Sequence, residues 1–381
     1  MNIKSIIKRQ LIRITKPCVI FESYPNFSDN TKQVFDEFVR RGLGKKYHLY
    51  WYVDKDTAAF FYSGVPVFWN TNRVSMFKNR IRNFIYYNNI KAVILCNRHI
   101  VPEPFSHCYK SFYLTHGTTL KDVSSYYKIP NEVDYCISPS EYLREAFSIS
   151  FDYDYNRIIP LGFPRNDVLS KEKINIKRIL NTNCNKIIVW YPTYKQHNGG
   201  YKTGCKHALP IIHNRKNAEI LNQYLNRKNV LIVLKPHFAQ DLSYINDIKM
   251  SNIRFINDRF YSEHNIIPYQ FLGSCDALIT DYSSVYSDFL LCNKPIGLIW
   301  EDIEDYKKNP GLVPMYEDIT CGTNKIYNLN DLMDFVKDVA LEKDKFESER
   351  NNLRDKLNIS TDGHNTERVV DFIIKKAKLK F

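Results

Sequence analysis

Two histidines follow apolar runs that lie in different halves of the chain. His116 comes directly after the run 111–115, and His237 comes shortly after the run 229–234. An imidazole accepts or releases a proton near neutral pH, so one ring can deprotonate an attacking hydroxyl while the other holds a phosphate or the departing oxygen. A single histidine after a strand is more often a turn or cap residue. Because each half supplies one, we predict that both are catalytic residues of one shared site.

Basic and small residues stand beside these histidines and after two other apolar runs. Gly117 would let a substrate approach closely beside the base. Arg165 and Lys235 carry positive charge for phosphate oxygens, and the planar guanidinium binds two oxygens at once. As surface ion pairs the same side chains would contribute little to stability. Their place at predicted strand ends therefore favours phosphate binding.

The run 278–291 joins a short apolar stretch, an acid and two hydroxyls to the spacing of an amphipathic helix. Ser283 and Ser284 occupy the position of a helix N-cap, where hydroxyls and free N–H groups hold an anion. This arrangement suits a phosphorylated ligand. A Ser-Ser cap on a strand-to-helix turn is also common in α/β proteins, so a purely structural role stays open.

Short apolar runs alternate with longer mixed segments after Pro17, which is typical of βαβ units with parallel sheets. The runs predict strands at 18–23, 47–53, 92–96, 111–115, 134–138, 157–161, 186–191, 229–234, 253–256, 276–280 and 295–299. Helical spacing occurs at 31–41, 141–148, 214–226, 284–292 and 329–342. We expect two doubly wound α/β domains that face each other across a cleft, with the ligand outside the carboxyl ends of the strands.

The polar stretch between about 168 and 183 separates the two strand-rich halves. The predicted division is a basic N-terminal helix over 1–17, a first domain over 18–168, a second domain over 183–360 and a C-terminal helix over 361–381. In the N-terminal helix, isoleucines and leucine recur at helical spacing among lysines and arginines. Residues 1–16 can therefore lie on an anionic membrane surface. Packing against the body of the protein is an equally good alternative.

The composition narrows the class of protein. The chain of 381 residues has a formal charge of +13, which favours polyanionic partners without choosing among them. Its nine cysteines form no CxxC pair, so we expect a reducing, cytoplasmic location and no structural zinc. The first residues lack the continuous apolar h-region of a secretory signal, so we expect no signal peptide. There is also no apolar run of ~20 residues and none of the GxGxxG, GxxxxGK[ST], HExxH or GxSxG motifs. The sequence predicts neither a metal ion nor a separate cofactor, and basic side chains with helix N-termini would hold a diphosphate.

Taken in order, these motifs resemble the CDP-glycerol glycerophosphotransferases, which build teichoic acids and related capsule polymers. The matching motifs are Ser28-Asp29-Asn30, His116-Gly117-Thr118 with Lys121, Gly162-Phe163-Pro164-Arg165-Asn166-Asp167, Tyr191-Pro192-Thr193-Tyr194, Lys235-Pro236-His237, Thr280-Asp281-Tyr282-Ser283-Ser284, Lys294-Pro295-Ile296 and Asp362-Gly363. Each motif alone is weak, whereas the ordered set is specific. Two departures, Thr119-Leu120 before Lys121 and Phe238 after the second histidine, bear on the acceptor and the alditol more than on the chemistry.

The resemblance implies a GT-B-like fold whose second domain holds a CDP-alditol, either CDP-glycerol or CDP-ribitol. The first domain would supply the base and receive a polyprenyl-linked or glycan acceptor, whose hydroxyl attacks phosphorus and releases CMP. His116 would be the general base and His237 the partner of the phosphate or leaving group. The remaining substrate-binding residues would be Gly117, Thr118, Arg165, Asn166, Thr193, Lys235, Asp281, Ser283 and Ser284. Asp281 would either orient its turn or meet an alditol hydroxyl.

Two other functions stay open at this point. The same fold could transfer a sugar from a nucleotide sugar, since both kinds of donor present a diphosphate to the cleft. The second alternative is a non-catalytic module that binds nucleic acid or anionic lipid. Because the basic residues are dispersed along the chain, we expect no binding of nucleic acid. The resemblance implies an enzyme at the inner face of the cell membrane. It does not distinguish glycerol from ribitol, or a single addition from polymerisation.

Overall fold

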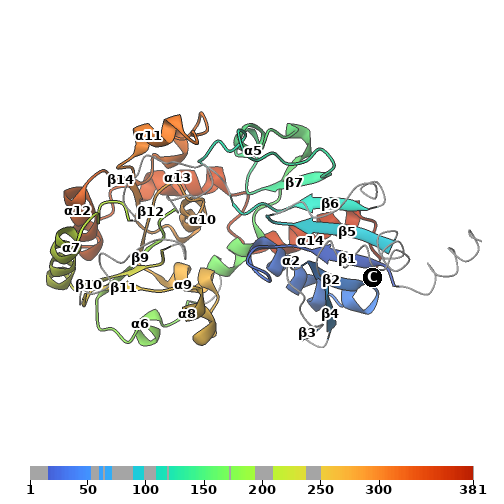
Figure 1. Cartoon of the computed structure of the whole chain (residues 1–381), viewed down its shortest axis with the longest axis horizontal. Coiled ribbons are helices and arrows are strands. Elements are labelled where there is room, and N and C mark those ends of the chain that lie inside the picture. Colours follow the sequence, from blue (N-terminus) through green and yellow to red (C-terminus); the bar gives the residue numbers. More distant parts are fainter. Residues whose placement is uncertain are drawn as a thin grey trace, which may run out of the picture.

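The chain folds into two lobes that lie side by side, each built on its own sheet (Figure 1). The structure is a computed structural model that describes residues 16–52, 60–62, 65–70, 89–97, 109–117, 120–170, 173–193, 209–236 and 250–380. Except for its last two residues, the predicted N-terminal helix over 1–17 lies outside this part of the chain. Within the described residues, no helix combines the length and the apolar character needed to cross a membrane.

The first lobe contains a sheet in the order β3-β4-β2-β1-β5-β6-β7-β8. Its strands are β1 (Cys18–Phe21), β2 (His48–Tyr52), β3 (Phe60–Tyr62), β4 (Val65–Asn70), β5 (Ile90–Leu95), β6 (Lys110–Tyr113), β7 (Tyr135–Ser138) and β8 (Ile158–Pro160). All neighbouring pairs are parallel except β3 with β4. The parallel arrangement brings the carboxyl ends of β1, β5 and β6 to one edge of the sheet.

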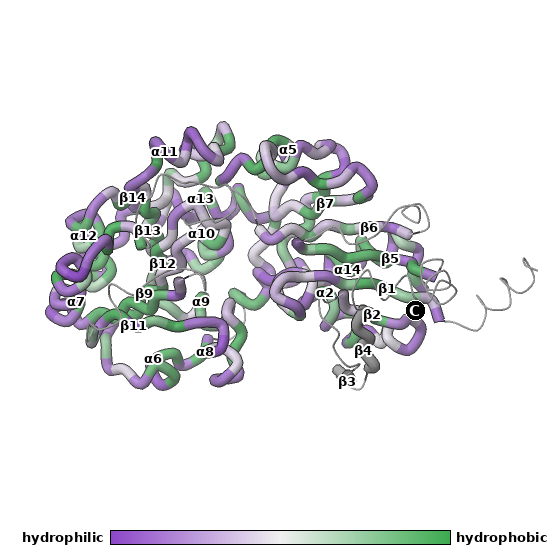
Figure 2. The backbone as a smooth tube through the Cα atoms, in the orientation of Figure 1, coloured by the Kyte–Doolittle hydropathy of each residue, from purple (hydrophilic) through white to green (hydrophobic). Residues whose placement is uncertain are grey.

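The second lobe contains a parallel sheet in the order β11-β10-β9-β12-β13-β14. Its strands are β9 (Lys186–Trp190), β10 (Val230–Leu234), β11 (Ile253–Phe255), β12 (Ala277–Thr280), β13 (Ile296–Ile299) and β14 (Asn324–Ile326). Every residue of β10 and β12 is buried, because strands of a parallel sheet are covered on both faces. Apolar residues accordingly run through the interiors of both lobes, and polar residues gather on outer helices such as α7 and α11 (Figure 2).

Helices cover both sheets and connect the strands. They are α2 (Asp29–Arg40), α5 (Arg144–Phe151), α6 (Ile176–Ile179), α7 (Arg215–Lys228), α8 (Asp258–Glu263), α9 (Pro268–Ser274), α10 (Val285–Phe289), α11 (Ile303–Lys308), α12 (Leu329–Ala340), α13 (Glu347–Leu357) and α14 (Asn365–Lys376). Short 3-10 helices are η1 (Leu43–Lys45), η3 (Tyr155–Arg157), η4 (Pro164–Ser170), η6 (Leu290–Cys292) and η7 (Asp318–Thr320). Together with one parallel and one mostly parallel sheet they make the GT-B-like α/β architecture expected from the sequence.

The last helix, α14, returns to the first lobe and packs there beside α2 (Figure 1). Val369, Val370 and Ile373 join the apolar core around β1 and α2. The carboxylate of Asp167 accepts hydrogen bonds from the backbone N–H groups of Asn365 and Thr366 at 2.9 and 2.7 Å. Asp167 thus caps the N-terminus of α14, and the chain crosses from the second lobe back to the first.

The predicted helix over 284–292 corresponds to α10 and η6, which together span 285–292, but its predicted amphipathic exposure is wrong. The α-helix α10 has only five residues and continues as η6. All five residues of α10 are buried, including Asp288. A helix this short, enclosed by other elements, has no solvent-facing side.

Candidate functional site

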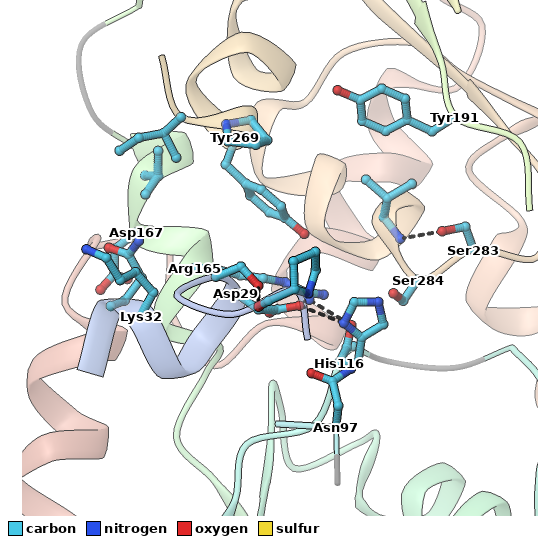
Figure 3. Close-up of a pocket in the computed structure, with 18 of the residues that line it drawn as sticks. Asp29, Lys32, Asn97, His116, Arg165, Asp167, Tyr191, Tyr269, Ser283 and Ser284 are labelled. Carbon is cyan, nitrogen blue, oxygen red and sulfur yellow. Dashed lines mark hydrogen bonds and ion pairs between the residues drawn. The ribbon is translucent and has the colours of Figure 1, made fainter. Parts of the chain in front are cut away.

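A cleft of about 1550 Å³ runs between the two lobes, and residues of both lobes line it. The predicted site residues among its lining residues are His116, Gly117, Arg165, Thr193, Lys235, Ser283 and Ser284. Figure 3 shows His116 between Asp29 and Ser284, with Arg165 and Tyr269 beside Asp29. Thr118 and His237 lie outside the described residues, so their predicted roles stay predictions. The cleft lies where the carboxyl ends of the strands meet, as expected for open α/β sheets.

His116 contacts a carboxylate that the strand-end analysis did not identify. Its Nδ1 lies 2.7 Å from Oδ2 of Asp29, the first residue of α2. The His116 side chain is 67% exposed, whereas that of Asp29 is 9% exposed. Burial alone would raise the pKa of Asp29, but the charge of Arg165 and the hydrogen bonds from Arg165 and His116 outweigh it and hold the pKa well below its usual range. The ionised carboxylate favours a proton on Nδ1, which leaves Nε2 available as a base.

A buried asparagine next to Asp29 fixes the segment that carries His116. The amide nitrogen of Asn30 donates to the carbonyl oxygens of Leu114 and Thr115 at 3.2 and 3.1 Å. Its side-chain oxygen accepts from the backbone N–H of Arg165 at 3.0 Å. One side chain thus joins α2, the end of β6 and η4.

Arg165 holds two carboxylates from opposite sides of the cleft. Its Nη1 donates to Oδ1 of Asp29 at 2.8 Å and to the carbonyl oxygen of His116 at 2.7 Å. Its Nη2 donates to Oδ2 of Asp288 at 2.7 Å. The side chain is buried, which would lower its pKa, but the charges of Asp288 and Asp29 raise that pKa. In this structure the guanidinium is a structural bridge, and its predicted contact with a donor phosphate stays a prediction.

Asp288 has a second partner in its own lobe. The hydroxyl of Tyr269, in α9, donates to the same Oδ2 atom at 2.6 Å. Burial raises the pKa of Tyr269, so the hydroxyl keeps its proton and acts as a donor. Tyr269 also lines the cleft beside Arg165. The bridge is therefore anchored in α9 and α10.

Asp281 orients a turn of the second lobe. Its Oδ2 accepts from the backbone N–H of Thr193 at 2.8 Å, and its Oδ1 accepts from the Thr193 hydroxyl. Both carboxylate oxygens are thus occupied, and the residue is buried. Of the two predicted roles for Asp281, this geometry supports orienting the turn and not contact with an alditol hydroxyl.

The two serines line the cleft, and Ser284 occupies the predicted N-cap position of α10, but its hydroxyl does not cap the helix. Ser284 precedes α10 with helical backbone angles and makes no side-chain cap hydrogen bond. The Oγ of Ser283 accepts only a long bond, 3.5 Å, from the N–H of Val285. Ser284 instead faces the first lobe, because a Cβ placed on Gly117 would lie 2.2 Å from its Oγ. The lobes therefore touch at this point.

Two more predicted residues lie at the edge of this arrangement. Nζ of Lys235 pairs with Oδ1 of Asp258 at 3.0 Å and reaches the cleft. Asn166 is buried and is not among the described residues that line the cleft. Its Oδ1 has no hydrogen-bond partner among the described residues. A direct contact of Asn166 with a substrate would require a rearrangement.

Three potential metal ligands converge at Asp29, Cys96 and His116, whose ligand atoms lie within 4.8 Å of one another. The Cys96 thiol donates to the carbonyl oxygen of Thr115 at 2.9 Å, and burial raises the pKa of this thiol well above its usual value. A metal ion would require the thiolate and would face the guanidinium of Arg165. We therefore interpret these residues as a hydrogen-bonded group.

A family described as CDP-glycerol:poly(glycerophosphate) glycerophosphotransferase matches residues 5–375. A teichoic acid poly(glycerol phosphate) polymerase of Bacillus spizizenii is 28% identical over 81% of this chain and 80% of its own length. A teichoic acid glycerol-phosphate transferase of Staphylococcus aureus is 25% identical over 94% of this chain and 93% of its own length.

Solved structures share the two-lobed fold. The wall teichoic acid polymerase TagF, in a crystal soaked with CDPG, has a TM-score of 0.69 and 21% identity and covers 99% of this chain and 96% of its own. A protein of Listeria monocytogenes described as a putative UDP-N-acetylglucosamine 2-epimerase has a TM-score of 0.55 at 12% identity and covers 96% of this chain and 98% of its own. The same architecture thus occurs with different chemistry, so the site residues must decide the function.

Proposed function

Because the chain belongs to the CDP-glycerol:poly(glycerophosphate) glycerophosphotransferase family, we propose that it transfers glycerol phosphate or ribitol phosphate from a CDP-alditol to an acceptor hydroxyl. The products would be CMP and a phosphodiester in a teichoic acid or capsule-type polymer. The observation that carries the proposal is the His116 imidazole, which reaches the cleft between the lobes while an ionised and largely enclosed Asp29 holds its Nδ1.

In the proposed reaction, Nε2 of His116 takes the proton of the acceptor hydroxyl. The oxygen attacks the phosphorus that bears the alditol, a new O–P bond forms, and the bond to the CMP oxygen breaks with its electron pair on CMP. The second lobe would hold the donor through Thr193, Ser283, Ser284 and Lys235, all of which line the cleft. His237 would contact the phosphate or leaving oxygen. Positioning and fixed charge are the means by which proteins accelerate phosphoryl transfer.

The first test is donor selection by the full chain. We expect CDP-glycerol or CDP-ribitol to raise the melting temperature, because a ligand that binds only the folded state stabilises it. The preferred donor should then release CMP in the presence of acceptor. UDP-N-acetylglucosamine serves as the control. Release of a nucleoside diphosphate, or stabilisation by the UDP-sugar alone, would favour a sugar transferase and contradict the proposal.

We also propose that the enzyme works at the cytoplasmic face of the cell membrane, where it meets a polyprenyl-linked or glycan acceptor. Support comes from the N-terminal segment over 1–16. Its isoleucines recur at helical spacing, and basic residues occupy many of the positions between them. Each basic residue near an anionic surface contributes about 1 kcal/mol of binding free energy. No nucleic acid is expected as a partner.

Deleting residues 1–16 should weaken binding to vesicles that contain anionic lipid, by ~10-fold or more if two or more basic residues contact the surface. Turnover of a water-soluble acceptor should not change. Cosedimentation with anionic and with neutral vesicles measures the first effect, and CMP release measures the second. Equal binding of both chains to anionic vesicles would show that the segment is not the membrane contact.

A further inference from the structure

A continuous chain of contacts links His116 in the first lobe to α9 and α10 in the second. It runs from Nδ1 of His116 to Asp29 at 2.7 Å, and from Asp29 to Nη1 of Arg165 at 2.8 Å. It continues from Nη2 of Arg165 to Asp288 at 2.7 Å and from Asp288 to the Tyr269 hydroxyl at 2.6 Å. Figure 3 shows the first-lobe part with Tyr269 pointing toward it.

The central part of this chain is shielded from water. Arg165 is 5% exposed and Asp288 is 1% exposed. When one partner of a buried ion pair is removed, the remaining charge is left uncompensated, so the other groups rearrange around it. The contacts of Arg165 are thus coupled to one another far more strongly than those of a surface pair.

The geometry of the guanidinium indicates what that rearrangement is. Arg165 donates from Nη1 to Asp29 and from Nη2 to Asp288, so each carboxylate binds one terminal nitrogen of the guanidinium. Without Asp288, both nitrogens can bind Asp29 in the bidentate form that arginine prefers. That form engages Oδ2 of Asp29, the atom that now contacts His116. Oδ2 would then be shared between the guanidinium and the imidazole, so the hold of Asp29 on Nδ1 of His116 would weaken.

The lobes touch at the same place. Gly117, next to His116, approaches both Ser284 and Nη2 of Arg165 so closely that a Cβ there would lie 2.2 and 2.7 Å from them. Ser284 is a predicted donor-binding residue. The segment that carries the base therefore rests on the lobe that would hold the donor.

We propose that Asp288 is a positioning residue for His116: acting through Arg165 and Asp29, it makes the orientation of the imidazole depend on contact between the two lobes. Tyr269 supports Asp288 in this role. The catalytic consequence rests on the proposed function, but the effect on the imidazole does not.

The kinetic test is a double-mutant cycle with Asp29→Asn and Asp288→Asn. We expect Asp29→Asn to lower kcat ~10²-fold or more, because a side-chain amide can donate to Nδ1 and favour the wrong tautomer. Asp288→Asn should lower kcat ~10-fold with little change in the KM for the donor. Since both act through one imidazole, the double variant should be no slower than Asp29→Asn. If the loss of kcat in the double variant equals the product of the two single losses, the residues act independently and the proposal is overturned.

The matched control is Asp302→Asn. Asp302 is a second-lobe carboxylate that accepts a tyrosine hydroxyl, from Tyr282 at 3.0 Å, as Asp288 does from Tyr269. It forms no ion pair with Arg165 in the described structure. We expect wild-type kcat. A loss equal to that of Asp288→Asn would mean that second-lobe carboxylates act on stability in general and would overturn the proposal.

A second readout needs no substrate, so it separates this inference from the proposed function. Side-chain ¹⁵N NMR distinguishes the two imidazole tautomers, and His116→Gln assigns the His116 signals. Both Asp29→Asn and Asp288→Asn should shift these signals, whereas Asp302→Asn should not. Should Asp288→Asn fail to fold, Tyr269→Phe keeps the ion pair and should shift the signals less, in the same direction. Unchanged signals in the folded second-lobe variant would overturn the proposal.

Discussion

Replacing His116 by glutamine should lower CMP release from the CDP-alditol ~10²- to 10⁴-fold, the usual contribution of a general base. Folding should be unaffected, because the side chain is 67% exposed and its loss leaves no buried cavity. Asp29 keeps Arg165 as an ion-pair partner, 2.8 Å away in this structure, so we expect no uncompensated carboxylate in the variant. Single-turnover CMP release gives the rate, and the melting temperature gives the stability.

The control for this variant is His364→Gln. His364 also lines the cleft and is largely exposed, and its Nδ1 lies 3.4 Å from a carboxylate oxygen of Glu367. It precedes α14 and takes no part in the contacts around Arg165 that the structure describes. We expect near wild-type turnover from it. Near-normal turnover by His116→Gln would remove this histidine from the mechanism, and an equal loss in both variants would show that the effect is not specific.

The sheets were predictable because their strands are buried. Runs such as 229–234 contain almost only apolar residues, and the corresponding strand β10 is covered on both faces. The strand β14 was missed because its sequence Asn324-Lys325-Ile326 has a single large apolar residue, although β13 pairs with it. β3 and β4 were also missed. At β14, the edge strand of its sheet, pairing with β13 supplies an element that no local apolar pattern predicts, whereas β3 and β4 do carry aromatic and β-branched residues.

The site was predicted in part, for a different reason. Residues after the strands were found because parallel strands end at one edge, and most of the described ones line the cleft. Asp29 and Asp288 were missed as functional residues because they lie in helices and meet Arg165 across 136 and 123 residues of sequence. The motif Ser28-Asp29-Asn30 was the available signal for Asp29. For Asp288 the sequence carries no such signal.

The role of Arg165 shows how burial decides what a charge does. From the sequence, a guanidinium after a strand indicates phosphate binding. In the fold the same group is enclosed with two carboxylates that neutralise it, so it is held as part of the wall between the lobes. The sequence provides the charge, whereas only the tertiary structure determines whether a ligand or another side chain balances it.

Gly117→Ala should reduce turnover at least ~10²-fold, since a displacement of about 1 Å at a reacting group has an effect of that size. The new Cβ would lie 2.2 Å from Oγ of Ser284 and 2.7 Å from Nη2 of Arg165, so the loop that carries His116 must move away from the second lobe. The φ angle of +141° adds backbone strain for any residue with a Cβ. CMP release measures the loss, and small-angle scattering detects a separation of the lobes.

The matched control is Gly42→Ala, which carries the backbone cost without the contact. Gly42 has a φ of +75°, and nothing lies within 4 Å of the position that the alanine methyl group would take. We expect it to lose about 1 kcal/mol of stability and to keep its turnover. If Gly117→Ala loses no more activity than this control, the lobes do not need to touch at Gly117 for the reaction, and the dependence of the base on the second lobe would have to run through Arg165 alone.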